Sequence, residues 1–454
     1  MPPLASRLFT MNSLREIPEL AALSSSRALI RIPPDFDVPL TDRVKRLIDT
    51  PQFRRLAHIS QLGLVRLVYP AANHSRFEHS LGVYRVALLF LARLAGDERF
   101  AALIQPRDAE RFLAAALLHD LGHWPFCHLI EDLCLDSMPG HESFAANFLQ
   151  QPQLADVLKS HWSIEPVEVA GLLTGESTDQ KSCVLQSMLS GPIDVDKMDY
   201  LMRDSLHAGV PYGRNFDQPR LIQSLCLNEA GDGLAITDKG KTAAEMMVFA
   251  RYVMFSEVYW HHAVRSATAM LQRAFFLLYQ EIDPEALFGL SDQPMIDALK
   301  KIAGQGPARE LLIGLFGPTR QLYKRVAQYS LFQQSETYEL LARKPYPWLV
   351  RCAEHFADLV SSELSHHVAA HEVIFDAPPV KLEVEFEMDV HFPKEDCYRR
   401  LGDVSPVVRT LAREQFDDYV KRVRVFVHPR VAAKVRSLPR LTQLLAESAS
   451  RSSE

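Results

Sequence analysis

The sequence predicts a mainly α protein, with a helical core followed by a smaller mixed α/β region. Apolar residues recur at three- and four-residue steps through most of the first 280 residues, which is typical of helices. Alternating apolar and polar residues, typical of strands, are concentrated after residue 380. The chain has 454 residues, of which 47% are hydrophobic, so it is long enough for two or three domains and can bury a large core.

The predicted core, residues 29–280, follows a segment that we expect to be flexible. Residues 1–28 are interrupted by Ser and Pro and predict a loosely ordered N-terminus. A short β run within residues 28–40 is broken by two prolines. Helices then follow, and the segments 81–96 and 109–122 each keep helical spacing and end at a glycine.

Two further patterns complete the core. Residues 229–240, "EAGDGLAITDKG", predict a small hairpin inserted between helices. Residues 243–279 keep helical spacing throughout and predict one long helix.

The C-terminal region, residues 281–445, has a different pattern. Its helices are expected to be shorter than those of the core. Residues 380–392, "VKLEVEFEMDVHF", alternate and predict a strand or hairpin, and "RVRVFVHP" at 422–429 predicts a second strand. Residues 446–454 are rich in Ser and predict a disordered tail.

Composition excludes several classes of protein. No apolar run reaches membrane-spanning length, and the first residues lack the apolar region of a secretory signal, so we expect a cytoplasmic protein with no membrane partner. The six cysteines form no CxxC pair, which argues against a disulfide framework or a thiolate zinc site. The net charge of −6 makes nucleic acid an unexpected partner.

The stretch "LLHDLGHWPFCH", residues 117–128, is the densest group of ionisable residues. A lone His-Asp pair is more often a core histidine beside a helix-terminal aspartate. Neighbouring residues lie roughly 100° apart around a helix, but both can reach an ion placed over the helix flank. Imidazole and carboxylate without thiolate suit a catalytic divalent metal, and the sequence does not choose among Mn, Fe, Zn, Ni, Co and Mg.

Other motifs accompany this stretch in a fixed order. "LIDTPQFRRLAHISQLG", "HSRFEHSLGV", "HDLGHWPFCH", "GHES" and "DVDKMDYLMRD" together resemble the HD-domain deoxynucleoside triphosphate triphosphohydrolases, the dGTPase-like and sterile-alpha-motif/HD group. The resemblance runs from about Thr41 to about Leu271. It implies a helical HD core with a metal site formed by His79, His119, Asp120 and Asp196.

The same resemblance implies catalytic roles for three histidines and one glutamate. Hydrolysis of a phosphate ester needs a nucleophile, neutralised phosphate oxygens and a protonated leaving group. His128 is the candidate acid, and Glu131, three residues later, would orient it on one helix face. His123 and His141 match histidines that bind phosphate oxygens or position water. Alone, His141 before a glutamate would more often be a helix N-terminal residue.

Substrate-binding residues are also implied. Arginine and lysine supply donors to a triphosphate, and the matched cations are Arg76, Lys197 and Arg251. The residues matched to the deoxyribose pocket are Gln61, Leu62, Tyr200, Asp204 and Tyr259. Asp204 and Gln61 would bond to the 3′-hydroxyl, and Tyr259 and Leu62 would crowd a 2′-hydroxyl. Without the resemblance, each arginine would be read as a surface residue and each tyrosine as packing.

The chain departs from the family pattern at two places. At the site where relatives hold a guanine activator, Asp49 remains, but Arg54 and Ala57 replace the matched Gln and Arg. His262 stands where relatives often have Lys, so a titratable group replaces a permanent cation. An allosteric nucleotide and a homo-oligomer are implied by the resemblance, and these departures leave the activator's identity open.

Three functional hypotheses follow. The first is hydrolysis of a dNTP to the deoxynucleoside and inorganic triphosphate. The second is the same site acting on a nucleoside monophosphate, cyclic nucleotide or alarmone. The third is a non-catalytic nucleotide sensor or nucleic-acid-binding module, against which the four intact metal-type residues and the acidic composition both argue.

Overall fold

The computed structural model describes residues 14–452 except 26, 35, 137, 177, 379–386 and 412–419. Helices dominate and the sheets are small, so the predicted mainly α class is confirmed. The helices of the N-terminal part are α2 Pro18–Ala22, α3 Asp42–Ile48, α4 Pro51–Arg54, α5 Arg76–Leu94, α6 Glu98–Leu103, α7 Pro106–Leu118, α8 Cys127–Glu131, α9 His141–Leu149, α10 Pro152–Val157, α11 Pro166–Thr174, α12 Gln180–Ser190, α13 Val195–His207, α14 Gln218–Gln223, α15 Lys241–Met254 and α16 His262–Leu278.

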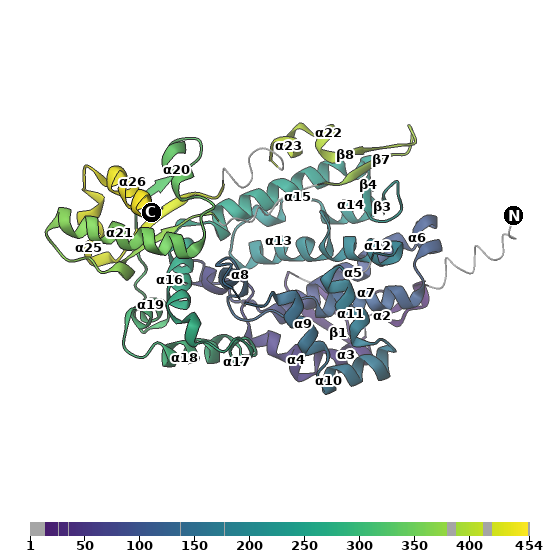
Figure 1. Ribbon diagram of the computed structural model, residues 1–454. Coiled ribbons are helices and arrows are strands. Elements are labelled where there is room, and N and C mark those ends of the chain that lie inside the picture. The colour runs from purple at the N-terminus through teal and green to yellow at the C-terminus, as the bar shows by residue number, and fades with distance from the viewer. Residues whose placement is uncertain are drawn as a thin grey trace, which may run out of the picture.

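The C-terminal part alternates helices with strands (Figure 1). Its helices are α17 Pro284–Phe288, α18 Asp292–Ile302, α19 Pro307–Phe316, α20 Ser335–Leu341, α21 Tyr346–Leu364, α22 Leu401–Val404, α23 Pro406–Arg409, α25 Pro429–Arg436 and α26 Leu441–Arg451. The expectation of shorter helices beyond residue 280 is wrong for α21, which has 19 residues.

The strands form three small sheets. They are β1 Leu29–Ile32, β2 Phe36–Pro39, β3 Leu225–Leu227, β4 Leu234–Thr237, β5 Lys324–Tyr329, β6 Val373–Asp376, β7 Asp389–Phe392, β8 Cys397–Arg400 and β9 Val423–Val427. β1 pairs with β2, the order β3-β4-β7-β8 makes a second sheet, and β5-β9-β6 makes a third. The hairpin predicted at 229–240 is present as the antiparallel β3–β4 pair, but its first strand, β3, precedes the predicted range. The strand predicted at 422–429 is confirmed as β9.

The C-terminal chain contributes to two places in the molecule. Figure 1 shows α20, α21, α25 and α26 together at the left, whereas β7, β8, α22 and α23 lie beside α15 and the β3–β4 hairpin. β7 pairs in parallel with β4, so residues far apart in sequence share one sheet. Of the strand predicted at 380–392, residues 380–386 lie outside the described residues, and Asp389–Phe392 form β7.

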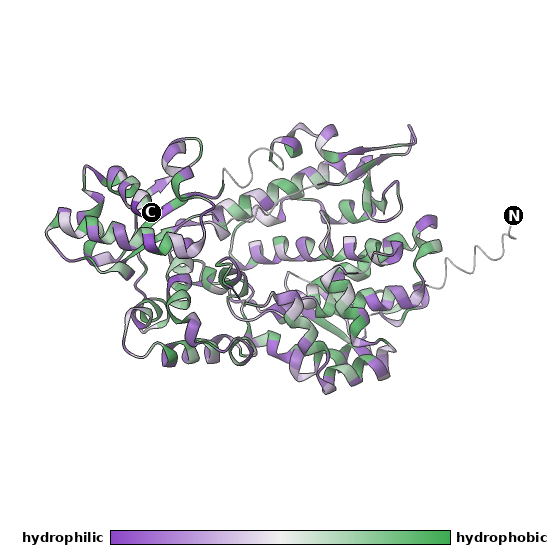
Figure 2. Ribbon diagram, viewed as in Figure 1, coloured by the Kyte–Doolittle hydropathy of each residue, from purple (hydrophilic) through white to green (hydrophobic). Residues whose placement is uncertain are grey.

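Two hydrophobic clusters hold the fold together. The first includes residues of α5, α7, α13 and α16 and continues into α17–α19. The second lies among the three-stranded sheet, α21, α25 and α26. Figure 2 shows hydrophobic and hydrophilic positions alternating along α13 and α15, as expected of helices with one buried face. The domain boundary predicted at residue 280 stays a prediction.

The terminal segments are more ordered than the sequence predicted. Leu14 and Leu20 are buried, and the buried carboxylate of Glu19 pairs with Arg43, so residues 14–22 are part of the core. Residues 1–13 of the predicted flexible segment lie outside the described residues. The predicted disorder from residue 446 is wrong through Arg451, because α26 packs against α21.

The predicted long helix at 243–279 is interrupted. α15 ends at Met254, a π-helical turn follows over Phe255–Tyr259, and α16 begins at His262. Such turns often occur at functional sites because the extra residue redirects a side chain. Here the turn contains Tyr259, one of the predicted sugar-pocket residues.

Three packed helices position the predicted metal residues. α5 packs against both α7 and α13. The Ser75 hydroxyl caps α5 by accepting from the Glu78 amide, and the Asp194 carboxylate caps α13 by accepting from the Lys197 amide. Among the described residues, no helix combines the length and hydrophobicity that a membrane span requires.

Candidate active site

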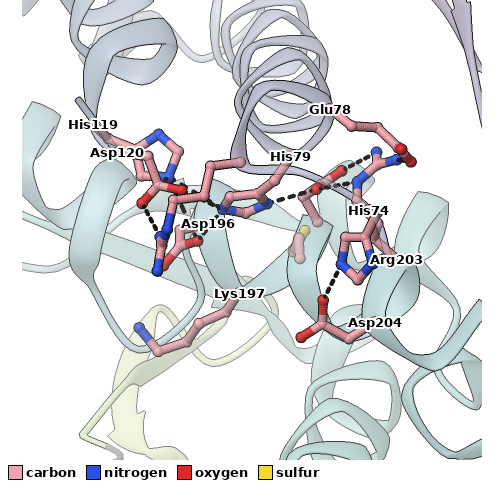
Figure 3. Close-up of polar contacts among 12 residues, drawn as sticks. His74, Glu78, His79, His119, Asp120, Asp196, Lys197, Arg203 and Asp204 are labelled. Carbon is pink, nitrogen blue, oxygen red and sulfur yellow. Dashed lines mark hydrogen bonds and ion pairs between the residues drawn. The ribbon is translucent and has the colours of Figure 1, made fainter. Parts of the chain in front are cut away.

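The four predicted metal residues lie together at the meeting point of α5, α7 and α13 (Figure 3). His79 Nε2 is 3.2 Å from His119 Nε2 and 3.0 Å from Asp196 Oδ1. His119 Nε2 is 3.6 Å from Asp120 Oδ1. Residues 117 positions apart, His79 to Asp196, therefore bring imidazole and carboxylate groups to one point.

This donor set fits a divalent metal. One atom each of His79, His119 and Asp196 lies within 4.8 Å of the other two. Asp120 Oδ2 is buried and accepts no hydrogen bond from the described residues. A buried carboxylate oxygen without a donor is costly unless a cation satisfies it. The Asp120 oxygen and the absence of thiolate from the set both match a catalytic metal centre.

The helix that carries the His-Asp pair ends earlier than predicted. α7 ends at Leu118 with His119 as its cap, so the end precedes Gly122 by several residues. Gly122 serves a different purpose, because a Cβ there would lie 2.0 Å from the carbonyl oxygen of His141. The glycine therefore allows α9, which carries His141, to approach the turn that contains His119 and Asp120.

A buried ion-pair network braces His79, and the sequence did not predict it. His79 Nδ1 lies 2.9 Å from Asp199 Oδ2, and Asp199 accepts two bonds of 2.8 Å from Arg203. Arg203 also donates to Glu78 at 2.6 Å. Gly82 makes room for this pair, since a Cβ there would lie 1.9 Å from Asp199 Oδ1. An Asp-Arg pair four residues apart was the available signal, but such pairs are usually exposed.

The carboxylates around His79 control its protonation. Burial acts to lower the pKa of His79, but hydrogen bonds to Asp196 and Asp199 raise that pKa to about 10. The Asp199 contact occupies Nδ1 and leaves Nε2 facing the other metal-type residues. Carboxylate partners of this kind fix the tautomer of a metal-binding histidine.

The predicted catalytic histidines form a second cluster beside the first. His123 Nδ1 is 3.1 Å from Asp120 Oδ1, and His123 Nε2 is 3.3 Å from His128 Nε2. The His123 and His141 rings lie 4.1 Å apart. Burial and nearby Arg76 lower the pKa of His123 well below its usual value, so its imidazole is neutral at neutral pH.

Glu131 is placed differently from the prediction. It contacts His141 more closely than His128, at 2.9 Å to Nδ1 of His141 against 3.4 Å to Nδ1 of His128. It also accepts from the His141 backbone amide at 2.9 Å. Burial acts to raise the pKa of Glu131, but His128 and His141 together hold it below its usual range. The carboxylate therefore orients two imidazoles rather than one.

The three predicted phosphate-binding cations have different partners. Arg76 Nη1 lies 2.9 Å from Asp120 Oδ1. Lys197 Nζ donates to Asp194 at 2.5 Å and to the Gly191 carbonyl at 3.1 Å, so this lysine is held by the α13 cap. The Arg251 guanidinium lies 5.7 Å from the Phe255 ring.

Arg55 is a cation that the sequence analysis missed. Its guanidinium donates to the His123 carbonyl at 2.8 and 2.9 Å. Burial, followed by the charge of Arg76, lowers the pKa of Arg55 to about 10. Arg55 therefore supports the turn that follows His119 and Asp120.

The predicted sugar pocket is only partly assembled around one carboxylate. Tyr259 Oη donates to Asp204 Oδ2 at 2.6 Å, and His74 Nε2 lies 2.9 Å from Asp204 Oδ1. The backbone amide of Gln61 donates to the His74 carbonyl, and its side-chain oxygen is buried without a hydrogen bond among the described residues. His74, which the sequence analysis missed, stacks on His207 at 4.3 Å.

The other two predicted pocket residues have fewer polar contacts. Leu62 and Tyr200 are partly buried and pack against the main hydrophobic cluster. Burial raises the pKa of Tyr200, so its hydroxyl stays protonated. Tyr200 lies on α13 between Asp196 and Asp204 at four-residue steps, so the three share a helix face.

A helical core that brings together one histidine, then an adjacent His-Asp pair, then a second aspartate along the chain is typical of an HD-domain protein. The family model described as HD domain matches residues 76–173, and the one described as HD associated region matches residues 216–449. The metal-type residues His79, His119 and Asp120 fall within the first of these matches.

Comparisons with individual proteins agree. The uncharacterized protein MJ1154 of Methanocaldococcus jannaschii is 31% identical over 380 residues, covering 83% of this chain and 74% of that protein. Deoxynucleoside triphosphate triphosphohydrolase SAMHD1 of Gallus gallus is 31% identical over 294 residues, covering 56% of this chain and 47% of that protein. A crystal structure of a hypothetical protein from Aquifex aeolicus has a TM-score of 0.69 and 27% identity, covering 90% of this chain and 98% of that one.

These matches place the chain in the HD-domain family of dNTP triphosphohydrolase-like proteins, a family of phosphohydrolases. The resemblance predicted from the sequence motifs is confirmed. The match covers about half of the length of the SAMHD1 relative.

Proposed function

We propose that this chain hydrolyses dNTPs to the deoxynucleoside and inorganic triphosphate. The observation that carries this proposal is the single stripe of Asp196, Tyr200 and Asp204 along α13. Eight residues of α-helix span about 12 Å, so a metal-binding end and a hydroxyl-binding end are set apart by roughly the length of a nucleoside phosphate. A nucleotide lying along this stripe would place its phosphates near His79 and its sugar near Tyr259.

His79, His119, Asp120 and Asp196 would hold the divalent metal. When bound, such an ion lowers the pKa of a coordinated water towards neutrality and neutralises phosphate charge. Arg76 lies beside this set, and Arg251 comes from α15. Both would fix phosphate oxygens with forked donors, together with Lys197 and neutral His123.

His128 would donate the proton that the leaving group requires. Water oxygen bonds to the α-phosphorus, the bond from phosphorus to the 5′-oxygen breaks, and the proton moves from His128 to that oxygen. The His128 side chain is 62% exposed, so a substrate can reach it without displacing core residues. Glu131 and His141 hold one edge of the imidazole in place.

The sugar end would select deoxyribose. Asp204 has both carboxylate oxygens engaged by His74 and Tyr259, which fixes its orientation towards a 3′-hydroxyl. Tyr259 Oη and Leu62 would occupy the space that a 2′-hydroxyl needs. The cytoplasmic location, the homo-oligomer and the allosteric nucleotide stay predictions.

The test is product analysis with Mn²⁺ and each dNTP, singly and in pairs. Asp196→Asn should reduce triphosphate release below detection and lower metal content, because it removes a carboxylate ligand. Asp156→Asn is the matched control, since that exposed aspartate lies on α10 away from the site. Full turnover by a metal-stripped Asp196→Asn protein would refute the mechanism. Release of orthophosphate or pyrophosphate would instead support the alternative nucleotide substrates.

A further inference from the structure

The histidines beside the metal site have a ligand geometry of their own. His123, His128 and His141 each present a ring nitrogen within 4.8 Å of the other two. His123 Nε2 and His128 Nε2 are 3.3 Å apart, close to the 3.2 Å between His79 Nε2 and His119 Nε2 in the first cluster. Ligands about 2.0–2.1 Å from a tetrahedral zinc lie roughly 3.3–3.4 Å apart. The His123 and His128 nitrogens therefore have the spacing of two ligands of one zinc ion.

The outer nitrogens of all three rings face carboxylates. Nδ1 of His123 is 3.1 Å from Asp120, Nδ1 of His128 is 3.4 Å from Glu131, and Nδ1 of His141 is 2.9 Å from Glu131. At His128 and His141 the Glu131 carboxylate favours the tautomer with the proton on Nδ1, whereas His123 Nδ1 makes no hydrogen bond among the described residues. His123 Nε2 and His128 Nε2 face each other across 3.3 Å, and a cation between them would engage one lone pair from each ring.

We propose that His123, His128 and His141 bind a second divalent cation of the zinc class, and that its binding inhibits hydrolysis. Three imidazoles without carboxylate ligands suit Zn²⁺ better than Mn²⁺, whereas the first cluster mixes nitrogen and oxygen donors. The exposed edge of His128 gives the ion a route from solvent. The inhibitory part rests on the proposed function, because a His128 nitrogen bound to a metal cannot donate a proton.

The binding test uses the full chain and Zn²⁺ alone. Equilibrium dialysis followed by metal analysis should find one Zn²⁺ fewer per chain in His128→Gln than in the unmodified protein. His128 is exposed, so this variant should fold, and circular dichroism checks that it does. His161→Gln, which changes an exposed histidine in another part of the chain, should match the unmodified protein. Equal zinc content in all three proteins would overturn the second site, whatever the substrate proves to be.

The inhibition test starts from protein loaded with Mn²⁺. Adding Zn²⁺ should abolish triphosphate release as a second ion binds, and desalted inhibited protein should hold one Mn²⁺ and one Zn²⁺ per chain. Inhibition with loss of Mn²⁺ would overturn the inhibitory role, since the zinc would then act by replacing the first metal. Binding of the second ion with full activity would overturn it as well. Absence of triphosphate release under Mn²⁺ alone would refute the proposed function and leave the binding test unaffected.

Discussion

Two buried arginine-aspartate pairs use the same chemistry in different parts of the molecule. In α13, Arg203 donates to both oxygens of Asp199 at 2.8 Å. Between α16 and β6, Arg265 donates to Asp376 at 2.6 and 3.1 Å. All four side chains are at most 5% exposed. Any difference in what these pairs do therefore comes from their neighbours.

The neighbours are a metal-type histidine in one case and the C-terminal sheet in the other. Asp199 continues to His79, whereas Asp376 lies 3.6 Å from Arg424 of β9. The Arg265 guanidinium also stacks 3.9 Å from the Trp260 ring, and Arg424 donates to the Trp260 carbonyl. The first pair thus positions a ligand, and the second joins the three-stranded sheet to the helical core. Substitutions that keep shape but remove charge can separate these roles.

The largest effect is expected at the pair beside the metal site. Asp199→Asn leaves Arg203 buried with one partner fewer, which should lower the free energy of unfolding by about 3–5 kcal/mol. It should also weaken metal binding by about 10–100-fold, because His79 loses the carboxylate that orients it. Urea unfolding of the metal-free protein and metal titration of the folded protein measure the two effects separately. Unchanged metal affinity would show that the network is structural only.

The second pair should affect stability alone. Asp376→Asn removes the carboxylate between Arg265 and Arg424, so a loss of about 3–5 kcal/mol in the free energy of unfolding is expected. Metal affinity of the folded protein should equal that of the unmodified chain, because Asp376 pairs with Arg265 and Arg424 rather than with His79. A fall in metal affinity as large as that of Asp199→Asn would end the distinction between the two pairs.

Much of the site could be predicted from sequence because each part has a local signal. His119 and Asp120 are adjacent, and His79 and Asp196 each lie in a short recognisable motif. The bracing by Asp199 could not be predicted, since the pair becomes buried only when α5 packs over it at Gly82. Spacing alone gives no sign of whether a helical Asp-Arg pair is exposed or buried.

The errors in the fold have similar causes. The π-helical turn before Trp260 adds one extra residue to the helical turn. The spacing of apolar residues over 243–279 does not reveal such an insertion. The Ser content of residues 446–454 predicts a disordered tail, yet Ser448 and Ala449 are buried within α26. Burial against a distant helix outweighed local composition in that segment.

The pH dependence of metal binding should reveal the charge around His79. Metal binds the deprotonated imidazole, and the pKa of His79 is raised to about 10 by Asp196 and Asp199 against the effect of burial. Between pH 9 and pH 7 the apparent affinity should therefore fall about tenfold for each unit of decreasing pH. In Asp199→Asn the slope should be shallower at the alkaline end of this range, because the loss of one charged partner lowers the pKa of His79 and leaves more of its imidazole deprotonated there. Calorimetric titration at several pH values measures both slopes.

The free energy of unfolding should change with pH in the opposite direction to the metal affinity. A pKa raised on folding adds stability that is fully present below the unfolded value of about 6.5 and is lost as the pH rises through about 10. The metal-free protein should therefore lose stability over this range, while the metal-loaded protein should not. Equal pH dependence of unfolding in the two forms would show that His79 is not the titrating group.

An exposed ion pair should have the smallest effect on stability and serves as the reference for the two buried pairs. Arg46 lies 2.7 Å from Asp42 four residues earlier on α3, and both side chains are at least 51% exposed. Solvent and salt screen such pairs, and ordering two long side chains offsets most of their attraction. Arg46→Gln should therefore leave Tm and metal affinity unchanged within error, although its ion-pair distance resembles those of the buried pairs. A Tm decrease comparable to that of Asp376→Asn would mean that distance rather than burial determines what an ion pair contributes in this protein.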